Sequence, residues 1–257
     1  MPEHISFSEL KEWADCPYFH KLKRIDKLSK FAGNIFTAFG KAIHTINEYH
    51  LLNEDCEAKF VIFDEEFKKE LLLLENKPEI KEIEQFSAQA RPIIRDILPA
   101  MHKYFGDFEV IAAEHALYEL IPEELSKKEF YFKGFIDLII KTKDKIVICD
   151  YKSCTYGWDR TKKNSKILQY QLLLYKYFYA RKFGLDLKNI DTCFILLKRT
   201  AKKDNAEVFR VTSGNIKMES CLKLLKNCLT NLDKGFAPKN RMACKYCEFY
   251  NTEHCKK

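Results

Sequence analysis

The chain has 257 residues, and its 44 Lys and Arg against 37 Asp and Glu give a formal net charge of +7. Hydrophobic residues make up 46% and charged residues 32%, which excludes a disordered chain and is typical of a globular protein. No stretch of about 18–20 residues is free of charge, so we expect no membrane span. The first ten residues lack the basic and apolar regions of a secretory signal, so we expect a cytoplasmic protein.

The first part of the chain predicts helices. Ser6 and Glu9 have the spacing of a capping box at the start of a first helix, and Cys16-Pro17 interrupts it. Apolar residues spaced for one helix face predict a longer helix over about 35–52. Further helical stretches rich in Glu, Lys and Leu are expected over 57–75 and 83–104, with Pro78 between them.

Beyond these helices the pattern changes to alternating strand-like and helix-like segments. We expect strands over 108–120, 129–141, 145–152, 191–198 and 206–212, and helices over 164–183 and 214–234. The stretch KTKDK joins the second and third strands as a hairpin. Helices before and after a compact group of strands indicate an α/β fold, a single domain over 1–257 with a central mixed β-sheet flanked by helices.

The strongest local signal lies on the two strands of this hairpin. On the second of them Ile148, Asp150 and Lys152 share one face, which changes abruptly from apolar to ionic. Charges on a core-facing row are unfavourable unless a bound cation or a paired charge compensates. Asp137 on the neighbouring strand can lie beside Asp150, and two carboxylates at strand ends suit a hard divalent ion such as Mg²⁺. The alternative is a structural ion pair between Asp150 and Lys152.

Two helices add polar residues to this signal. Gly40, His44 and Glu48 follow one another at four-residue spacing, and a neutral imidazole can complete the coordination of Mn²⁺ or Mg²⁺. We expect Gly40 to let its helix approach the sheet, while His44 alone also fits an ordinary packed histidine. Gln171 and Tyr175 form a similar pair after the Asp150 strand, either contacting substrate or belonging to a tyrosine-rich core stripe.

In this order, Gly40-x-x-x-His44, Gly-x-Ile-Asp137, Asp150-x-Lys152 and Gln171-x-x-x-Tyr175 resemble the RecB-type branch of the PD-(D/E)XK nucleases. That branch includes the nuclease domains of RecB and AddB and CRISPR-associated exonucleases. The resemblance implies a restriction-endonuclease-like core in which His44, Asp137, Asp150 and the Tyr151 carbonyl bind Mg²⁺ or Mn²⁺. It also implies that Lys152 is the catalytic lysine, and that Gln171 and Tyr175 support the site or the DNA strand.

Four of the ten cysteines lie near the two ends of the chain, at positions 16, 244, 247 and 255. Four thiolates can hold either a tetrahedral Zn²⁺ or a [4Fe–4S] cluster, and the spacing alone does not separate these options. The same family has members with one cysteine before the nuclease core and three after it, which bind an iron–sulfur cluster. The resemblance therefore implies a structural [4Fe–4S] cluster that joins residues 1–30 to 236–257, with His254 or Cys228 as an alternative fourth ligand.

Basic and aromatic residues follow the Asp150 strand, a mixture that suits backbone charge and base stacking on nucleic acid. The candidate DNA-binding residues are Tyr156, Trp158, Arg160, Lys162 and Lys163. The alternative for such a cluster is an ordinary solvated surface.

Together these features predict a Mg²⁺- or Mn²⁺-dependent deoxyribonuclease in which Lys152 helps to activate the attacking water. By family analogy we expect an exonuclease acting on DNA with single-stranded ends in recombination, repair, CRISPR adaptation or phage DNA processing, with a helicase or integrase as a candidate partner. The alternative is a catalytically silent DNA-binding or complex-assembly module that keeps the nuclease fold.

Overall fold

The computed structural model describes residues 4–29 and 32–256. Its helices lie close to the predicted ranges, and Ser6 caps the first one through the expected reciprocal hydrogen bonds with Glu9. The main helices are α1 (Phe7–Asp15), α3 (Ile35–Tyr49), α4 (Cys56–Leu72), α5 (Ile80–Phe105), α7 (Lys166–Phe183) and α8 (Asn215–Asp233). Two four-residue helices that the sequence pattern did not predict are α2 (Pro17–His20) and α6 (Arg160–Lys163).

The described strands form one sheet of six strands, which is mixed as predicted. They are β1 (His4–Ser6), β2 (Glu109–Leu120), β3 (Tyr131–Lys141), β4 (Ile146–Cys154), β5 (Ile190–Lys198) and β6 (Ala206–Arg210). The order along the sheet is β1-β3-β4-β5-β6, and β2 pairs with β3. The β1–β3 and β4–β5 pairs are parallel and the others are antiparallel. The prediction missed only β1, which is three residues long.

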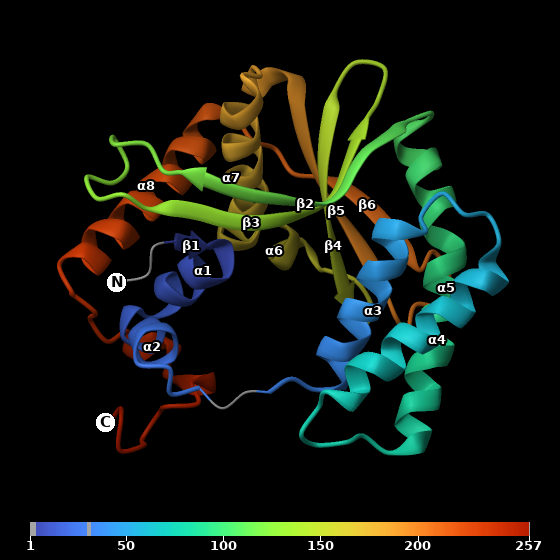
Figure 1. Cartoon of the computed structure of the whole chain (residues 1–257), viewed down its shortest axis with the longest axis horizontal. Helices are drawn as coiled ribbons and strands as arrows, with labels where there is room; N and C mark the ends of the chain where they lie inside the picture. Colours follow the sequence, from blue (N-terminus) through green and yellow to red (C-terminus); the bar gives the residue numbers. More distant parts are fainter. Residues whose placement is uncertain (1–3, 30–31, 257) are drawn as a thin grey trace.

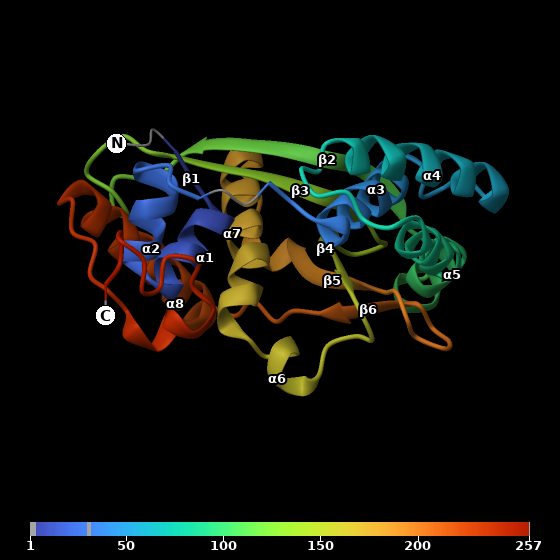
Figure 2. The same cartoon turned by 90° about the horizontal axis from the view of Figure 1, so that it is seen from below.

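A separate apolar core lies on each face of the sheet, because residues that alternate along a strand point to opposite faces. On one face Ile148 and Phe194 pack with residues of α1, α7 and α8. On the other face Val147 and Tyr151 pack with residues of α3, α4 and α5. Figure 2 shows the two groups of helices on opposite sides of the strands.

The first and last parts of the chain lie side by side, with α1, α2 and the C-terminal segment grouped in both Figure 1 and Figure 2. The Tyr18 backbone N–H donates to the Pro238 carbonyl at 3.2 Å, and the Asn240 side chain donates to the Asp15 carbonyl at 2.8 Å. In the described part of the chain, no helix is long and apolar enough to cross a lipid bilayer.

Candidate active site

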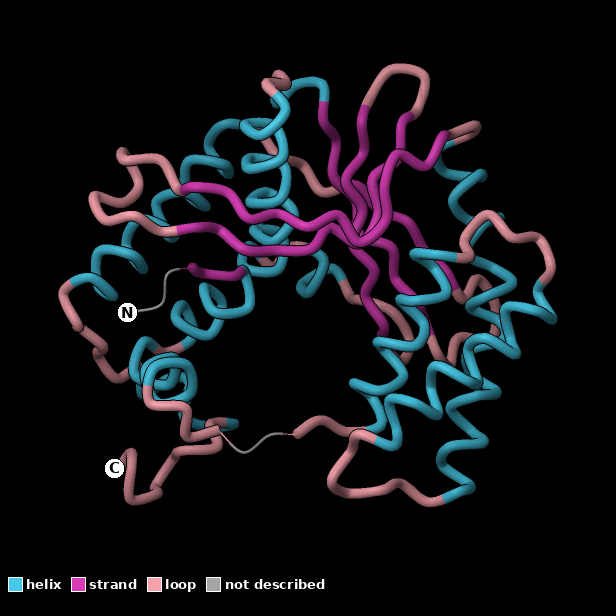
Figure 3. The backbone as a smooth tube through the Cα atoms, in the orientation of Figure 1, coloured by secondary structure: helices cyan, strands magenta, loops and turns pink. Residues whose placement is uncertain are grey.

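The site begins at a fork in the sheet. β4 pairs with β3 over residues 138–141, whereas β1 pairs with the same edge of β3 over residues 131–133. Among the described strands, none pairs with residues 134–137 on this edge, and Figures 1 and 3 show β3 and β4 diverging here. Asp137 lies at the fork, where its Oδ2 accepts the Tyr151 backbone N–H at 2.7 Å. The carboxylate thus takes the place of the next ladder hydrogen bond between the two strands.

Asp150 and Lys152 lie on β4 beside this fork, with Lys152 Nζ 2.7 Å from Asp150 Oδ2. Asp150 is only 1% exposed. Burial raises the pKa of Asp150 to about 6, and Asp137 adds to this rise while the Lys152 ammonium opposes it. The ion pair with Lys152 therefore offsets part of the free-energy cost of burying the Asp150 carboxylate, and a bound cation would offset more of it.

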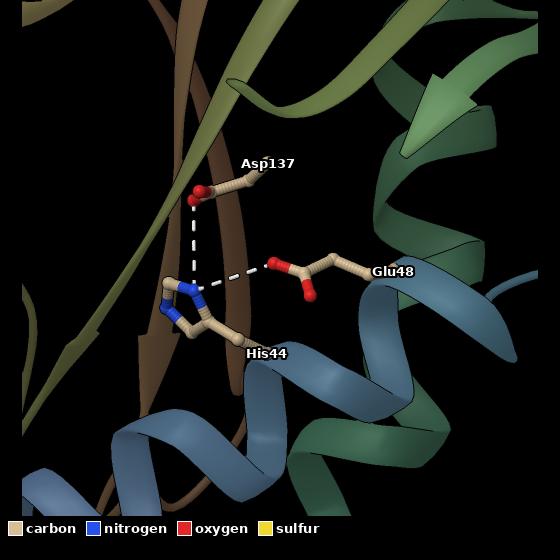
Figure 4. A group of neighbouring side chains, drawn as sticks. All are labelled: His44, Glu48 and Asp137. Carbon is tan, nitrogen blue, oxygen red and sulfur yellow. Dashed lines mark ion pairs between the residues drawn. The ribbon is translucent and has the colours of Figure 1, made fainter. Parts of the chain in front are cut away.

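Two residues of α3 face Asp137 across the fork, as Figure 4 shows. His44 Nδ1 lies 3.6 Å from Asp137 Oδ2 and 3.8 Å from Glu48 Oε1. One ligand atom from each of these three residues lies within 4.8 Å of the others, a spacing that could hold a metal ion. Burial lowers the pKa of His44 to about 4, so that at neutral pH the imidazole is uncharged and has a lone pair to offer a metal.

Glu48 is the residue of this group to which the sequence pattern gave no role, although it lies on the same helix stripe as His44. Its side chain is only 9% exposed, and no described residue donates it a hydrogen bond. Burial, with Asp137 and Glu114 nearby, raises the pKa of Glu48 to about 8. Burial also raises the pKa of Asp137 to about 6. Two carboxylates and an imidazole therefore lie together with few hydrogen-bond donors around them. Oxygen and imidazole ligands of this kind suit a hard divalent cation.

Glu114 on β2 is a further acidic residue near the site. The pairing of β2 with β3 passes from Ala113–Leu138 to His115–Ile136, which sets Glu114 opposite Asp137. Its φ of 45° is left-handed, which a residue with a side chain adopts at a cost of about 1–3 kcal/mol. The Tyr49 hydroxyl donates to its carboxylate. No sequence pattern marked Glu114, because its place opposite Asp137 depends on the register between β2 and β3, which the sequence does not show.

Gln171 and Tyr175 on α7 meet Lys152 in a chain of hydrogen bonds. Gln171 Oε1 accepts from Lys152 Nζ at 2.8 Å, and Gln171 Nε2 donates to the Tyr175 hydroxyl at 3.1 Å. Tyr175 is 5% exposed, and burial raises the pKa of its hydroxyl. A Cβ at Gly134 would lie 2.7 Å from Tyr175 Cε1, so only glycine leaves room for this ring against β3. These contacts fix the direction of the lysine side chain.

The contacts of Gly40 and Tyr151 bear on the roles that the sequence predicted for them. A Cβ at Gly40 would lie 3.6 Å from Ser153 Oγ, which is an ordinary contact, so the prediction that glycine lets α3 approach the sheet is wrong. Tyr151 packs edge-on against His44 with ring centres 5.7 Å apart, and its hydroxyl donates to the Asn47 carbonyl at 3.2 Å. These contacts position His44, whereas the ligand role of the Tyr151 carbonyl stays a prediction.

The basic and aromatic segment after β4 divides into exposed and buried residues. Tyr156 is 76% exposed, whereas Trp158 is only 8% exposed and packs against Phe194 and Phe209. Little of the indole ring is therefore free for base stacking. Of the three predicted basic residues, Arg160 and Lys162 are exposed and Lys163 pairs with Glu207, while Lys162 Nζ also lies 5.0 Å from the centre of the Trp158 ring.

The four terminal cysteines line one cavity of about 340 Å³ between α2 and the C-terminal segment. The Asn240 backbone N–H lies 3.3 Å from Cys16 Sγ. Burial raises the pKa of the Cys247 thiol, and the thiols of Cys16, Cys255 and Cys244 raise it further because they lie near. No three of these four sulfur atoms, all of which the structure describes, lie within 4.8 Å of one another. Tetrahedral zinc at 2.3 Å from each sulfur would need sulfur atoms about 3.8 Å apart.

Comparisons with known proteins agree with this geometry. Residues 4–252 match the family model described as the PD-(D/E)XK nuclease superfamily. The chain belongs to this superfamily. A crystal structure from Eubacterium rectale named "Putative exonuclease" is similar over 96% of this chain and 86% of that one, with a TM-score of 0.59 and 11% identity, which shows a shared fold.

A second crystal structure, that of SSO0001, is similar over 85% of this chain and 96% of that one, with 16% identity. Its TM-score of 0.37 is too low to support an argument. No curated protein matches the chain.

Proposed function

We propose that the protein is a divalent-metal-dependent deoxyribonuclease of the RecB-like branch that removes nucleotides from DNA ends. The observation that carries this proposal is the buried Asp150–Lys152 pair beside the His44, Glu48 and Asp137 group at the fork of the sheet. A merely structural ion pair between Asp150 and Lys152 would leave the Glu48 carboxylate, which is held out of water, without a function.

The residues that would hold the cation are His44, Asp137 and Asp150, with the Tyr151 carbonyl and Glu48 as further oxygen donors. A bound Mg²⁺ or Mn²⁺ supplies Lewis-acid stabilisation of charge on the phosphate and leaving oxygen. The chain's own residues orient the reaction. Asp137 ties β3 to β4, Asp150 holds the Lys152 ammonium, and Gln171 with Tyr175 fixes the position of that ammonium.

Lys152 can act on the incoming water in two ways. Its ammonium, held by Asp150 and Gln171, can donate a hydrogen bond to an oxygen of the scissile phosphate and stabilise developing negative charge. The same positive charge favours ionisation of a water placed between the lysine and the phosphate. Both effects require the ammonium to stay at the fork, and its ion pair with Asp150 and its hydrogen bond to Gln171 hold it there.

Action on DNA ends is the finer part of the proposal. It is supported by the name of the Eubacterium rectale protein with the same fold and by the resemblance of the site motifs to RecB-type nucleases. The exposed Tyr156, Arg160 and Lys162 next to the site are the proposed contacts to the DNA strand.

We also propose that the four terminal cysteines hold a [4Fe–4S] cluster with a structural role. The support is the cavity that all four thiols line and their spacing, which is wider than a single zinc ion requires. Such a cluster would join the start of α2 to the C-terminal segment, which the Tyr18 hydroxyl and the Tyr18 backbone N–H already connect through hydrogen bonds.

The test is cleavage of oligonucleotides labelled at the 5′ or the 3′ end, single- and double-stranded, with Mg²⁺, Mn²⁺ or EDTA. We expect cutting only with the divalent ions, and a ladder of single-nucleotide steps from one end. Internal cuts in a closed circular strand would contradict the exonuclease assignment. DNA binding without cutting under every condition would favour the catalytically silent module.

A further inference from the structure

A basic pocket of about 630 Å³ lies away from the metal ligands, between the start of α7, the start of α8 and strand β6. Half of its lining residues are basic and none is acidic. The basic residues are Arg160, Lys163, Lys166, Arg210 and Lys217. Such a lining suits a ligand that carries negative charge.

Part of this positive charge is uncompensated. Lys163 pairs with Glu207, and Arg210 pairs with Asp191 at 2.8 Å. Within the described chain, the other three basic residues of the pocket form no ion pair. Lys217 Nζ donates instead to the neutral oxygens of Gln169 and Thr212, at 2.7 and 2.9 Å. Partial burial lowers the pKa of Lys217, and no acidic residue of the described chain pairs with it to offset this effect.

Two further features point to an anionic ligand. The 18-residue helix α7 and the 19-residue helix α8 both begin at the pocket, and neither has a side-chain hydrogen bond at its N-cap. Free backbone N–H groups at a helix start favour phosphate groups. In addition, Trp158 lines the pocket while 92% buried, and among the described residues its indole N–H finds no acceptor. Because this N–H is itself shielded from solvent, a phosphate oxygen would reach it only after a shift of the indole ring.

The pocket is connected to the proposed active site across one face of the sheet. Lys152 on β4 lies 5.8 Å from the centre of the Phe194 ring on β5, and that ring lies 5.2 Å from the ring of Trp158. Phe194 also pairs with Phe209 on β6, which lines the pocket. Two strand spacings, about 10 Å, therefore separate the β4 site from the β6 edge of the pocket.

We propose that this pocket binds a phosphate group of the nucleic-acid strand a few nucleotides away from the bond that is cut. The proposal rests on the nuclease function proposed above and adds a second anchoring point for its substrate. Lys166, which belongs to the basic segment that follows β4 in the sequence, and Lys217, to which the sequence pattern gave no role, would contact the phosphate. The starts of α7 and α8 would support it. A strand anchored at two points would be held in register with the metal site.

The experiment compares Lys166→Gln/Lys217→Gln with a control double variant, Lys223→Gln/Lys226→Gln, whose lysines are exposed further along α8. Glutamine removes the charge but keeps most of the side-chain length and a hydrogen-bond donor. Binding of a fluorescent 20-nucleotide single strand is measured by anisotropy in EDTA at several salt concentrations, so that no cutting is needed. Thermal unfolding confirms that all variants are folded.

We expect Lys166→Gln/Lys217→Gln to bind the single strand at least 10-fold more weakly than the parent protein. The slope of log affinity against log salt concentration should become shallower by about 1.4, which is about 0.7 for each lost phosphate contact to a single strand. The control should change affinity by less than 2-fold. Equal effects of the two double variants would overturn the proposal. Weaker binding of inorganic phosphate with unchanged binding of the strand would also overturn it, by assigning the pocket to a free anion.

Because the binding is measured without divalent ions, the result does not depend on catalysis. If the protein cuts no DNA but the first double variant binds DNA more weakly, the pocket is supported and the nuclease proposal fails. If the protein cuts DNA but the Lys166→Gln/Lys217→Gln variant binds DNA normally, the nuclease proposal is supported and the pocket proposal fails.

Discussion

At the scale of single residues, the site depends on carboxylates that the fold holds out of water. Glu48 shows this most clearly, because no described residue donates a hydrogen bond to it and its pKa rises to about 8. An ordinary exposed glutamate has no reason to stay protonated at neutral pH. The protonated form of Glu48 is therefore the stable one in the metal-free protein, and a bound cation would favour the ionised form instead.

This leads to a prediction about stability and pH. The folded pKa of Glu48 lies above its unfolded value, so its contribution to stability is lost as the pH rises through about 8. In EDTA, we expect the free energy of unfolding to fall between pH 7 and 8.5 more steeply in the parent protein than in Glu48→Gln. The difference cannot exceed about 1.4 kcal/mol per pH unit, the limit for one proton. Urea unfolding at four pH values measures it.

The exposed Glu84→Gln serves as the control for this measurement, and its curve should parallel that of the parent protein. Parallel curves for the parent and Glu48→Gln would show that Glu48 is already ionised at pH 7, contrary to the pKa that its burial implies.

A second residue-scale prediction concerns Lys152, the only lysine within reach of both Asp150 and Gln171 among the described residues. We expect Lys152→Gln to lower the cleavage rate at least 100-fold, because a neutral amide no longer stabilises charge on the phosphate. DNA affinity should change less than 3-fold, since one cation among many is lost. Lys141→Gln, at the exposed end of β3, is the control. A rate within 3-fold of the parent would remove Lys152 from the chemistry.

At the scale of elements, the sequence predicted most of the fold because each helix and strand carries its own periodicity. It did not predict the fork between β3 and β4. The point at which the hydrogen bonding between two strands ends depends on which other strand pairs with the same edge, and local periodicity does not show this. The three-residue β1 occupies the same edge of β3 over residues 131–133, and its sequence is too short to carry a pattern. Asp137 and Asp150 could be predicted as neighbours, but Glu114 could not.

The packing of α7 against β3 gives a prediction at this scale. Gly134→Ala places a Cβ 2.7 Å from the Tyr175 ring and forces that ring to move, at a cost of about 1–3 kcal/mol. Gln171 then loses its hydrogen-bond partner, so cleavage should fall more than stability alone explains. The measurements are thermal unfolding and the cleavage rate well below the unfolding temperature.

Gly40→Ala is the matched control, because its Cβ meets Ser153 Oγ at an ordinary distance. We expect it to stabilise the protein by up to about 1 kcal/mol, as alanine does in a helix. If Gly40→Ala destabilised the protein and Gly134→Ala did not, position 40 would be the crowded one and position 134 the open one, which would contradict the described contacts.

At the scale of the whole molecule, the two ends of the chain meet at the cysteine-lined cavity. The sequence could predict that Cys16 and the tail cysteines belong together only through the resemblance to RecB-type nucleases, because more than 200 residues separate them. It could not predict that Trp158 is buried, since burial depends on the aromatic residues that β5 and β6 bring to it.

The cysteine cavity gives a prediction for the intact protein. Anaerobically purified protein should be brown and contain about four iron and four sulfide per chain. Cys16→Ser should lose this iron and unfold at a lower temperature, whereas Cys56→Ser, which lies outside the cavity, should keep both properties. If the protein is colourless and contains one zinc per chain, the cluster assignment is wrong and the four cysteines form a zinc site.

The proposed function requires that the fork between β3 and β4 holds a divalent cation that serves DNA hydrolysis. The most direct measurement is the cleavage rate of an end-labelled oligonucleotide by the parent protein and by Asp150→Asn, each with Mn²⁺ and with EDTA. We expect rapid cutting only by the parent with Mn²⁺, and a rate at least 100-fold lower for the variant although it still binds the oligonucleotide. Cutting by Asp150→Asn at the parental rate, or by the parent in EDTA, would contradict the proposed function.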